Sequence, residues 1–274
     1  MLKQRVITAI ILALAFLAAL FLLPWNFFAA FIGAVLAVGA WEWAGLAGFK
    51  QPLARYGYVI VVAGLALLAG WVSDWAQNEQ VFRSIMVVAC VWWGVALLLI
   101  KSFPKSAVLW GARAVRLIMG VCVLLPAWLG SVYLRQQDAG AWLMLFVVFL
   151  VAAADIGAYF TGKAIGRTKL AYAVSPGKSW EGVGGGIVFA IVLALVFNFL
   201  LGADAILSLM LIAIPTSSIS VVGDLLESMM KRYCGVKDSS QLLPGHGGVL
   251  DRIDGLVAAI PAFTLVYIFS HWHF

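Results

Sequence analysis

Long apolar segments separated by short polar stretches follow one another along the whole chain. A helix that crosses a membrane needs about 20 predominantly apolar residues, and nine segments reach or approach that length. They are residues 6–23, 27–46, 58–72, 81–100, 117–134, 141–160, 183–201, 205–222 and 253–269. The third is short, and the eighth has to continue into the charged stretch that follows it. The pattern predicts an all-α polytopic integral membrane protein with about nine transmembrane helices.

The composition agrees with this prediction. Hydrophobic residues make up 64% of the 274 residues and charged residues only 11%, whereas a soluble domain carries about 25% charged residues. The net charge of +6 indicates no nucleic-acid partner, because basic residues at membrane edges orient a chain and meet anionic lipid. The three cysteines suggest no disulfide framework. The first apolar segment lacks a small-residue cleavage site, so we interpret it as a retained helix.

The basic residues predict the orientation of the chain. If the N-terminus is cytoplasmic and the segments alternate in direction, sixteen of the 18 lysines and arginines fall on the cytoplasmic side. Only Arg83 and Arg135 fall outside. Cytoplasmic loops are enriched in lysine and arginine. We therefore expect a cytoplasmic N-terminus and an outer C-terminus, with His271 and His273 at the outer end and without a function.

Charged side chains concentrate in residues 217–254, after the start of the eighth segment. If the first part is helical, residues at three- or four-residue steps share one face. They are Ser217, Ser220, Asp224, Glu227, Ser228 and Lys231. A Gly/Ser loop, the turn PGHGG and a second acidic pair, Asp251 and Asp254 around Arg252, follow. Carboxylates at membrane depth are costly and indicate a functional site; the alternative is an ion pair that only fixes helix packing.

Two features lie in the sixth segment and in the loop after it. Asp155 shares a helical face with Tyr159 and Lys163, and is interpreted as a metal ligand or substrate contact, with an Asp–Lys pair as the alternative. The loop SPGKSWEG, residues 175–182, resembles the end of a phosphate-binding loop, but Tyr172 stands where that motif needs glycine. Its lysine and serine can still hold phosphate beside a helix N-terminus.

Two glycine-rich segments leave alternatives open. The glycines among residues 182–186 allow either close approach of a ligand to the backbone or close helix packing. His246, in PGHGG, is either a site residue or part of a turn.

The cytoplasmic concentration of carboxylates and cations predicts a class of chemistry. Carboxylates in this number suit Mg²⁺, which is typically held by one or two carboxylates and substrate phosphates. The charged stretch holds a single cysteine, Cys234, and no paired histidines, which argues against zinc. Lysines and arginines around such an ion are typical of phosphoryl or nucleotidyl transfer. A site among membrane helices suits a lipid substrate.

The segment 228–254, SMMKRYCGVKDSSQLLPGHGGVLDRID, resembles the signature of the phosphatidate cytidylyltransferases, also called CDP-diacylglycerol synthases. SPGKSWEG and the segment around Asp155 are similar to that family as well. The resemblance implies condensation of CTP with phosphatidic acid to give CDP-diacylglycerol and pyrophosphate in the bilayer. It also implies a homodimer in the inner membrane of a bacterium, Mg²⁺ on Asp224 and Asp251, and K⁺ as an associated ion.

The residues receive roles from this combined interpretation. The expected catalytic residues are Asp224, Ser228, Lys231, Asp251 and Arg252. The expected substrate-binding residues are Asp155, Ser175, Lys178, Ser179, Arg232, Lys237, Asp238, His246, Gly247 and Gly248. The expected metal ligands are Asp224, Asp251 and Asp254.

Two regions follow from this assignment. Residues 1–136 are expected to form a scaffold for dimer or lipid contacts, and residues 137–274 the catalytic region with its site at the cytoplasmic face. Two alternatives remain. A secondary transporter also places aspartates near broken helices, although its site lies at mid-membrane and no inverted repeat is visible here. A purely structural membrane scaffold leaves the cost of the charged cluster unexplained.

Overall fold

The computed structural model describes residues 2–73, 78–201 and 206–270. Within these ranges, nine helices are long and apolar enough to cross a membrane, which confirms the nearly all-α fold and its nine segments. They are α1 (Leu2–Leu22), α2 (Trp25–Leu46), α3 (Pro52–Val72), α4 (Glu79–Lys101), α6 (Arg113–Gln136), α7 (Gly140–Ile165), α8 (Trp180–Leu201), α9 (Ile206–Tyr233) and α10 (Leu250–Ser270). A short helix, α5 (Ala107–Trp110), precedes α6. His271, His273 and the C-terminal residue lie outside the described residues.

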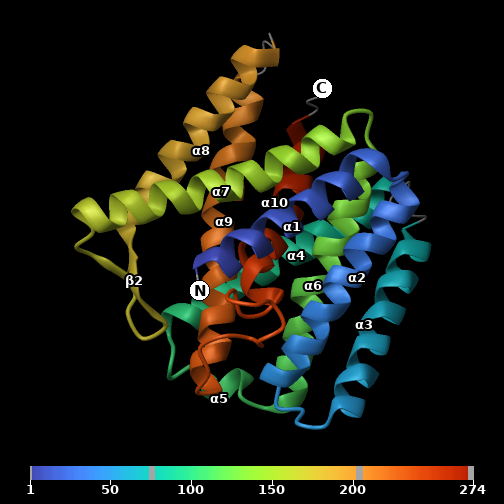
Figure 1. Cartoon of the computed structure of the whole chain (residues 1–274), viewed down its shortest axis with the longest axis vertical. Coiled ribbons are helices and arrows are strands. Elements are labelled where there is room, and N and C mark those ends of the chain that lie inside the picture. The colour runs from blue at the N-terminus through green and yellow to red at the C-terminus, as the bar shows by residue number, and fades with distance from the viewer. Residues whose placement is uncertain (1, 74–77, 202–205, 271–274) are drawn as a thin grey trace.

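The helices pack around α6 and α10, whose side chains are mostly buried. On one side, α2 packs against α3 and α6; on the other, α9 runs along α10 and α7 runs along α8 (Figure 1). Tryptophans tie α2 to α6: Trp43 Nε1 donates to the Arg116 carbonyl at 2.7 Å, and Trp128 Nε1 donates to the Ala29 carbonyl at 3.0 Å. The N-terminal helices therefore form a fixed frame beside the charged helices.

The charged stretch lengthens α9. This helix has 28 residues and ends at Tyr233, so at 1.5 Å per residue it is about 42 Å long, whereas the hydrocarbon core of a bilayer is about 30 Å thick. Its first part is apolar and its last turns carry Asp224, Glu227 and Lys231. The expected continuation of the eighth segment into the charged stretch is confirmed, and it carries these side chains to one end of the bundle.

A β-hairpin between α7 and α8 differs from the expected loop. Strand β1 (Lys169–Ala171) pairs antiparallel with β2 (Ser175–Ser179), with Lys169 opposite Ser179. The sequence hides this strand because SPGKS contains proline and glycine, which are uncommon in strands and occur mainly at edges. The Glu181 carboxylate accepts hydrogen bonds from the backbone N–H groups of Arg167 and Thr168 at 3.1 Å. These bonds fix the hairpin at the start of α8.

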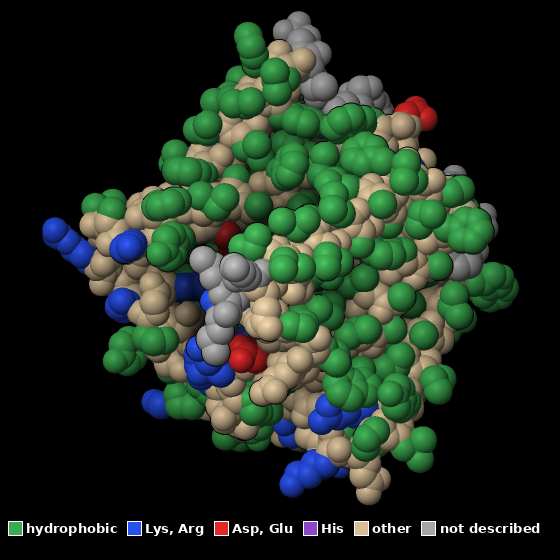
Figure 2. Space-filling view, viewed as in Figure 1, with side chains coloured by type: hydrophobic (Ala, Val, Ile, Leu, Met, Phe, Trp, Pro, Cys, Tyr) green, Lys and Arg blue, Asp and Glu red, His purple; other side chains and the backbone are tan. Residues whose placement is uncertain are grey.

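The surface separates apolar from basic regions. Hydrophobic side chains cover most of the face shown in Figure 2, as expected for helices that meet lipid. Lysines and arginines gather toward its lower and left parts, where Figure 1 places the β-hairpin and α5. The basic residues thus lie toward one end of the bundle, near the hairpin.

Candidate active site

Helices α9 and α10 touch at Gly223, next to Asp224. A Cβ atom at this position would lie 2.2 Å from the Asp254 carbonyl oxygen and 2.9 Å from the Ala258 Cβ. Small residues let helix backbones approach this closely. The contact sets the charged turns of the two helices side by side.

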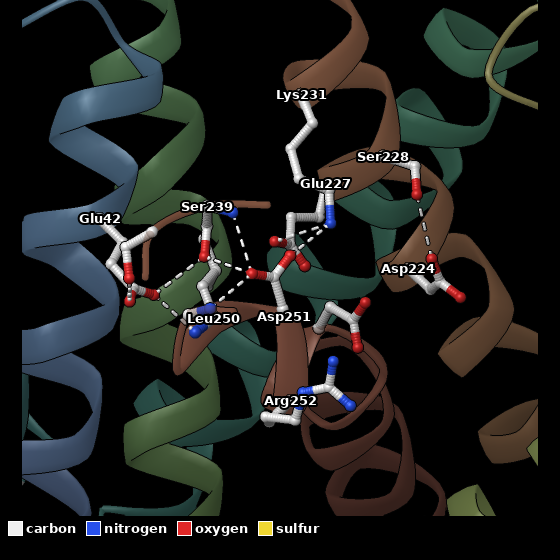
Figure 3. Close-up of polar contacts among 12 residues, drawn as sticks. Glu42, Asp224, Glu227, Ser228, Lys231, Ser239, Leu250, Asp251 and Arg252 are labelled. Atoms are coloured by element: carbon white, nitrogen blue, oxygen red, sulfur yellow. Dashed lines mark hydrogen bonds and ion pairs between the residues drawn. The ribbon is translucent and has the colours of Figure 1, made fainter. Parts of the chain in front are cut away.

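Asp251, in the first turn of α10, makes contacts through both of its carboxylate oxygens. Its Oδ2 accepts from the Ser239 N–H at 2.9 Å and the Gly248 N–H at 2.8 Å, and lies 2.9 Å from the Ser239 hydroxyl. Its Oδ1 lies 2.6 Å from Lys231 Nζ. The side chain is 5% exposed. Asp251 therefore holds the loop before α10 and the lysine of α9 together (Figure 3).

Lys231 lies between two carboxylates. Its Nζ is 3.3 Å from Glu227 Oε1, one turn earlier on α9, as well as 2.6 Å from Asp251. The Glu227 side chain is 3% exposed, and burying such a charge without a partner would cost several kcal/mol. Lys231 thus offsets buried negative charge on both helices.

Asp224 lies on the other side of this cluster. Its carboxylate accepts a hydrogen bond from Ser228 Oγ at 3.2 Å and forms an ion pair with Lys178 of the hairpin. The Lys178 and Asp224 side chains are 26% and 34% exposed, so solvent reaches this pair. Asp155 on α7 interacts electrostatically with both of them.

Asp254 connects the two sides of the cluster. Its carboxylate interacts with Asp224, Glu227 and Lys178. The cluster therefore comprises five carboxylates, those of Asp155, Asp224, Glu227, Asp251 and Asp254, and the two lysines Lys178 and Lys231. Neighbouring carboxylates repel one another. Because the cluster has more carboxylates than lysines, it favours binding of a cation.

The sequence matches the cytidylyltransferase family over residues 3–270. The chain belongs to the cytidylyltransferase family. A phosphatidate cytidylyltransferase of Pseudomonas aeruginosa is 48% identical over 274 residues, covering 99% of each chain. One of Haemophilus influenzae is 46% identical, covering 98% of this chain and 99% of its own, and one of Thermotoga maritima is 33% identical, covering 97% and 96%. The resemblance inferred from residues 228–254 is confirmed.

In this member of the cytidylyltransferase family, the expected catalytic carboxylates and lysine come together as the sequence predicts. Ser228 donates to Asp224, and Lys231 donates to Asp251, while Lys178 reaches Asp224 from the hairpin. Glycine is required at Gly247, where a Cβ would lie 2.9 Å from Asp251 Oδ2 and 3.2 Å from the Asp238 Cβ. The substrate and metal roles of these residues stay predictions.

Other predicted site residues make structural contacts. Ser179 Oγ accepts from the Gly182 N–H at 3.1 Å and caps α8. Arg232 Nε donates to the Val174 carbonyl at 3.3 Å and holds the hairpin against α9. Arg252 Nη2 donates to the His246 carbonyl at 2.9 Å. PGHGG forms a turn, in which the His246 N–H donates to the Leu243 carbonyl at 2.9 Å, and a site role for the His246 imidazole stays a prediction.

The remaining expectations divide between the hairpin and the loop before α10. Ser175 begins β2, and Lys237 is exposed in the loop. Among the described residues, Asp155 and Lys163 form no ion pair. Lys163 Nζ lies 5.9 Å from the centroid of the Tyr159 ring. Three glycines of the run, Gly182, Gly185 and Gly186, pack against α7, and a Cβ at Gly186 would lie 2.6 Å from the Ala154 carbonyl oxygen. Gly184 has open space around it.

Glu42 is the site residue that the sequence reasoning missed. It lies in α2, among helices that the sequence presents as generic, and its side chain contacts the loop before α10 (Figure 3). An acidic residue flanked by two tryptophans in an apolar segment is a signal that could have found it, because carboxylates at membrane depth indicate function.

A cysteine nucleophile finds no support near the cluster. Burial raises the pKa of the Cys234 thiol, an effect that the nearby Arg116 guanidinium partly offsets. Cys234 Sγ lies 3.0 Å from the Leu46 carbonyl, to which it donates. The thiol thus joins α2 to the end of α9 and remains protonated at neutral pH.

The donor set determines where a metal ion would fit. Among the described residues, no group of three or more His, Cys, Asp or Glu side chains is already arranged around a metal position. Lys178 and Lys231 lie against the carboxylates instead. Both oxygens of Asp224 and both of Asp251 have partners within the chain, but the Asp224 side chain is 34% exposed and that of Asp251 only 5%. Carboxylate oxygens suit Mg²⁺, and Asp224, with Asp254 beside it, is the more accessible donor. The metal roles of Asp224, Asp251 and Asp254 stay predictions.

Proposed function

We propose that this chain condenses CTP with phosphatidic acid, giving CDP-diacylglycerol and pyrophosphate, as a homodimer in the inner membrane of a bacterium. The observation that carries the proposal is similarity over almost the full length to relatives named phosphatidate cytidylyltransferase. The cluster of carboxylates and lysines at the ends of α9 and α10 supports it, because it supplies charged groups for phosphates beside lipid-facing helices.

The chemistry requires charge neutralisation more than a base. An oxygen of the lipid phosphate attacks the α-phosphorus of CTP, a new P–O bond forms, and the bond to the β-phosphate breaks, so that pyrophosphate leaves. A phosphomonoester is largely ionised at neutral pH, since its second pKa is about 6. No strong general base is therefore needed at the attacking oxygen.

The side chains of this chain hold the phosphates. Lys178 is partly exposed on the hairpin, so a phosphate can reach its ammonium group. Lys231 is fixed between Glu227 and Asp251 and supplies positive charge from the opposite side. Ser228 donates a hydrogen bond to Asp224 and orients it. Mg²⁺ held by Asp224, Asp251 and Asp254, with K⁺ as an associated ion, would offset the charge of the CTP phosphates.

The orientation is part of the proposal, and it is supported by the basic residues gathered toward the hairpin end of the bundle (Figure 2). We expect the hairpin and the site to be cytoplasmic, the loop between α6 and α7 to be outside, and Phe274 to be outside. In a background without native cysteines, an impermeant maleimide should label Gln137→Cys in intact cells and Lys169→Cys only after permeabilisation. The reverse pattern would contradict the orientation.

The assay for the function uses the purified chain in detergent with CTP, phosphatidic acid and Mg²⁺. Pyrophosphate release should require all three, and CDP-diacylglycerol should form in equal amount. Omission of phosphatidic acid is the control for simple CTP hydrolysis. Ion-driven uptake by sealed vesicles without CTP turnover would instead support the transporter alternative.

Lys178 should matter for substrate and not for stability. Its ion pair with Asp224 is partly exposed, and such pairs contribute about 0–1 kcal/mol to stability. Lys178→Ala should therefore keep a melting temperature close to that of the unchanged chain, while kcat/KM for CTP falls by about tenfold or more as a charge-assisted phosphate contact is lost. Lys163→Ala, which removes a lysine lying over Tyr159, is the matched control. Equal kinetics for the two variants would remove Lys178 from the site.

A further inference from the structure

Glu42 is a carboxylate with no exposed surface, near the C-terminal end of α2. Its exposed fraction is 0%, and it lies within α2, an apolar membrane-spanning helix. Among the described residues, no lysine or arginine forms an ion pair with it. A buried charge without compensation is expensive, so its neutral partners must stabilise it.

Those partners all come from one short segment, residues 239–250. Glu42 Oε1 accepts from the Ser240 hydroxyl at 2.5 Å and the Val249 N–H at 3.0 Å. Oε2 accepts from the Leu250 N–H at 2.7 Å and lies 3.1 Å from the Ser239 hydroxyl. Each carboxylate oxygen thus receives one backbone N–H and faces one serine hydroxyl.

The backbone donors stand at the start of α10. The first N–H groups of a helix have no acceptor within the helix, and a nearby side chain of the same segment usually supplies one. Here the acceptor comes from α2, and its negative charge also suits the positive end of the helix dipole. Glu42 therefore fixes where α10 begins.

The same segment is held from its other side by Asp251. Ser239 Oγ lies between the two carboxylates, 3.1 Å from Glu42 Oε2 and 2.9 Å from Asp251 Oδ2 (Figure 3). A Cβ at Gly248 would lie 2.0 Å from Ser239 Oγ and 2.6 Å from Glu42 Oε1, so the segment fits between them only with glycine there. If the Glu42 side chain moved, Ser239 would move with it, and the positions of Asp251 and Lys231 would change in turn.

We infer that Glu42 is a positioning residue for the reaction: through Ser239, Ser240 and the first turn of α10, it sets Asp251 and Lys231 in the geometry that the phosphates require. The inference rests on the proposed function. It assigns a role in the site to the N-terminal half of the chain, from which none of the predicted site residues came.

Glutamine cannot replace this carboxylate. Because each oxygen of Glu42 accepts a backbone N–H, the NH₂ group of a glutamine would face one of those N–H groups in either orientation. One buried donor would then lack an acceptor, although size and shape are nearly unchanged. Glu42→Gln is therefore a sharp test, and Glu79→Gln is its matched control, because the Glu79 side chain is 68% exposed and its ion pair with Arg83 is long, at 3.9 Å.

The experiment measures hydrogen exchange, melting temperature and CTP kinetics on the full chain in detergent. In Glu42→Gln, exchange of the amides in residues 239–250 should accelerate by about tenfold or more, as expected for loss of a buried hydrogen bond. At a temperature well below melting, kcat for CTP per folded molecule should fall by a similar factor of about ten, and KM should change less. Glu79→Gln should match the unchanged chain in all three.

Two results would overturn the inference. One is unchanged exchange in residues 239–250; the other is accelerated exchange with kcat within about twofold of normal, which would make Glu42 a stabilising residue only. If Glu42→Gln fails to fold, Ser240→Ala can be used, because it removes only one hydroxyl donor to Oε1. It should also accelerate exchange in residues 239–250 and lower kcat, but by smaller factors. Absence of CTP turnover in the unchanged chain would instead refute the proposed function, and the exchange data would still decide whether Glu42 holds the segment.

Discussion

Replacing Asp251 by asparagine should abolish CTP turnover and weaken the fold, whereas replacing Asp224 by asparagine should abolish turnover alone. Asp251 is 5% exposed and pairs with Lys231, and breaking a buried pair costs about 3 kcal/mol or more. Asp224 is 34% exposed, so loss of its ion pair should cost about 1 kcal/mol or less. Both variants should lose about a thousandfold in kcat, because both remove charge that orders cations around the phosphates.

The measurement pairs melting temperature without Mg²⁺ with CTP turnover in its presence. Asp138→Asn is the control, since Asp138 lies in the turn between α6 and α7, away from the cluster. A stable Asp224→Asn variant with near-normal turnover would remove Asp224 from the candidate metal ligands. An Asp251→Asn variant as stable as the unchanged chain would show that Lys231 is sufficiently paired by Glu227 alone.

Replacing Gly223 by alanine should separate α9 from α10. The added Cβ would lie 2.2 Å from the Asp254 carbonyl oxygen and 2.9 Å from the Ala258 Cβ, and backbone cannot yield as a flexible side chain can. Overpacking of this kind costs about 1–3 kcal/mol or more. Because Asp224 and Asp254 flank the contact, turnover should also fall by about tenfold or more when the two helices move by even 1 Å.

Gly184→Ala, also in a membrane-spanning helix, is expected to lower neither stability nor turnover. A Cβ at Gly184 in α8 would meet nothing within 4 Å, and alanine favours a helix over glycine by about 1 kcal/mol. Gly184→Ala should therefore melt at the same temperature as the unchanged chain or higher, with normal turnover. If Gly223→Ala behaves in the same way, the close contact of α9 and α10 is wrong.

The sequence predicts the nine helices because their signal is local. Twenty apolar residues in succession leave few alternatives to a membrane span, and the spacing of Asp224, Ser228 and Lys231 already places them on one face of α9. The hairpin escapes prediction for the opposite reason. Strand β1 has three residues and β2 contains proline and glycine, so its formation depends on tertiary contacts such as that of Arg232 with Val174.

The pairing of charges is also set by tertiary structure. Helical spacing places Lys163 on the same face of α7 as Asp155. The lysine that interacts with Asp155 is nevertheless Lys178, because the hairpin places it next to α7 and α9. Glu42 shows the same limit at longer range, because no periodicity relates α2 to the loop before α10. The expected division at residue 136 remains a prediction, and this contact crosses it.

The contact between Glu42 and Leu250 spans 208 residues of sequence, which has a consequence for the order of biosynthesis. At about 5–20 residues per second, a ribosome needs roughly 10–40 s to make the intervening chain. During that time α2 carries a carboxylate whose four acceptor contacts do not yet exist, and water or the insertion machinery has to solvate it. Arrival of the last helix therefore both completes the bundle and removes an unsatisfied charge from the membrane, so a chain truncated before Leu250 would retain that charge and should be a target for quality control.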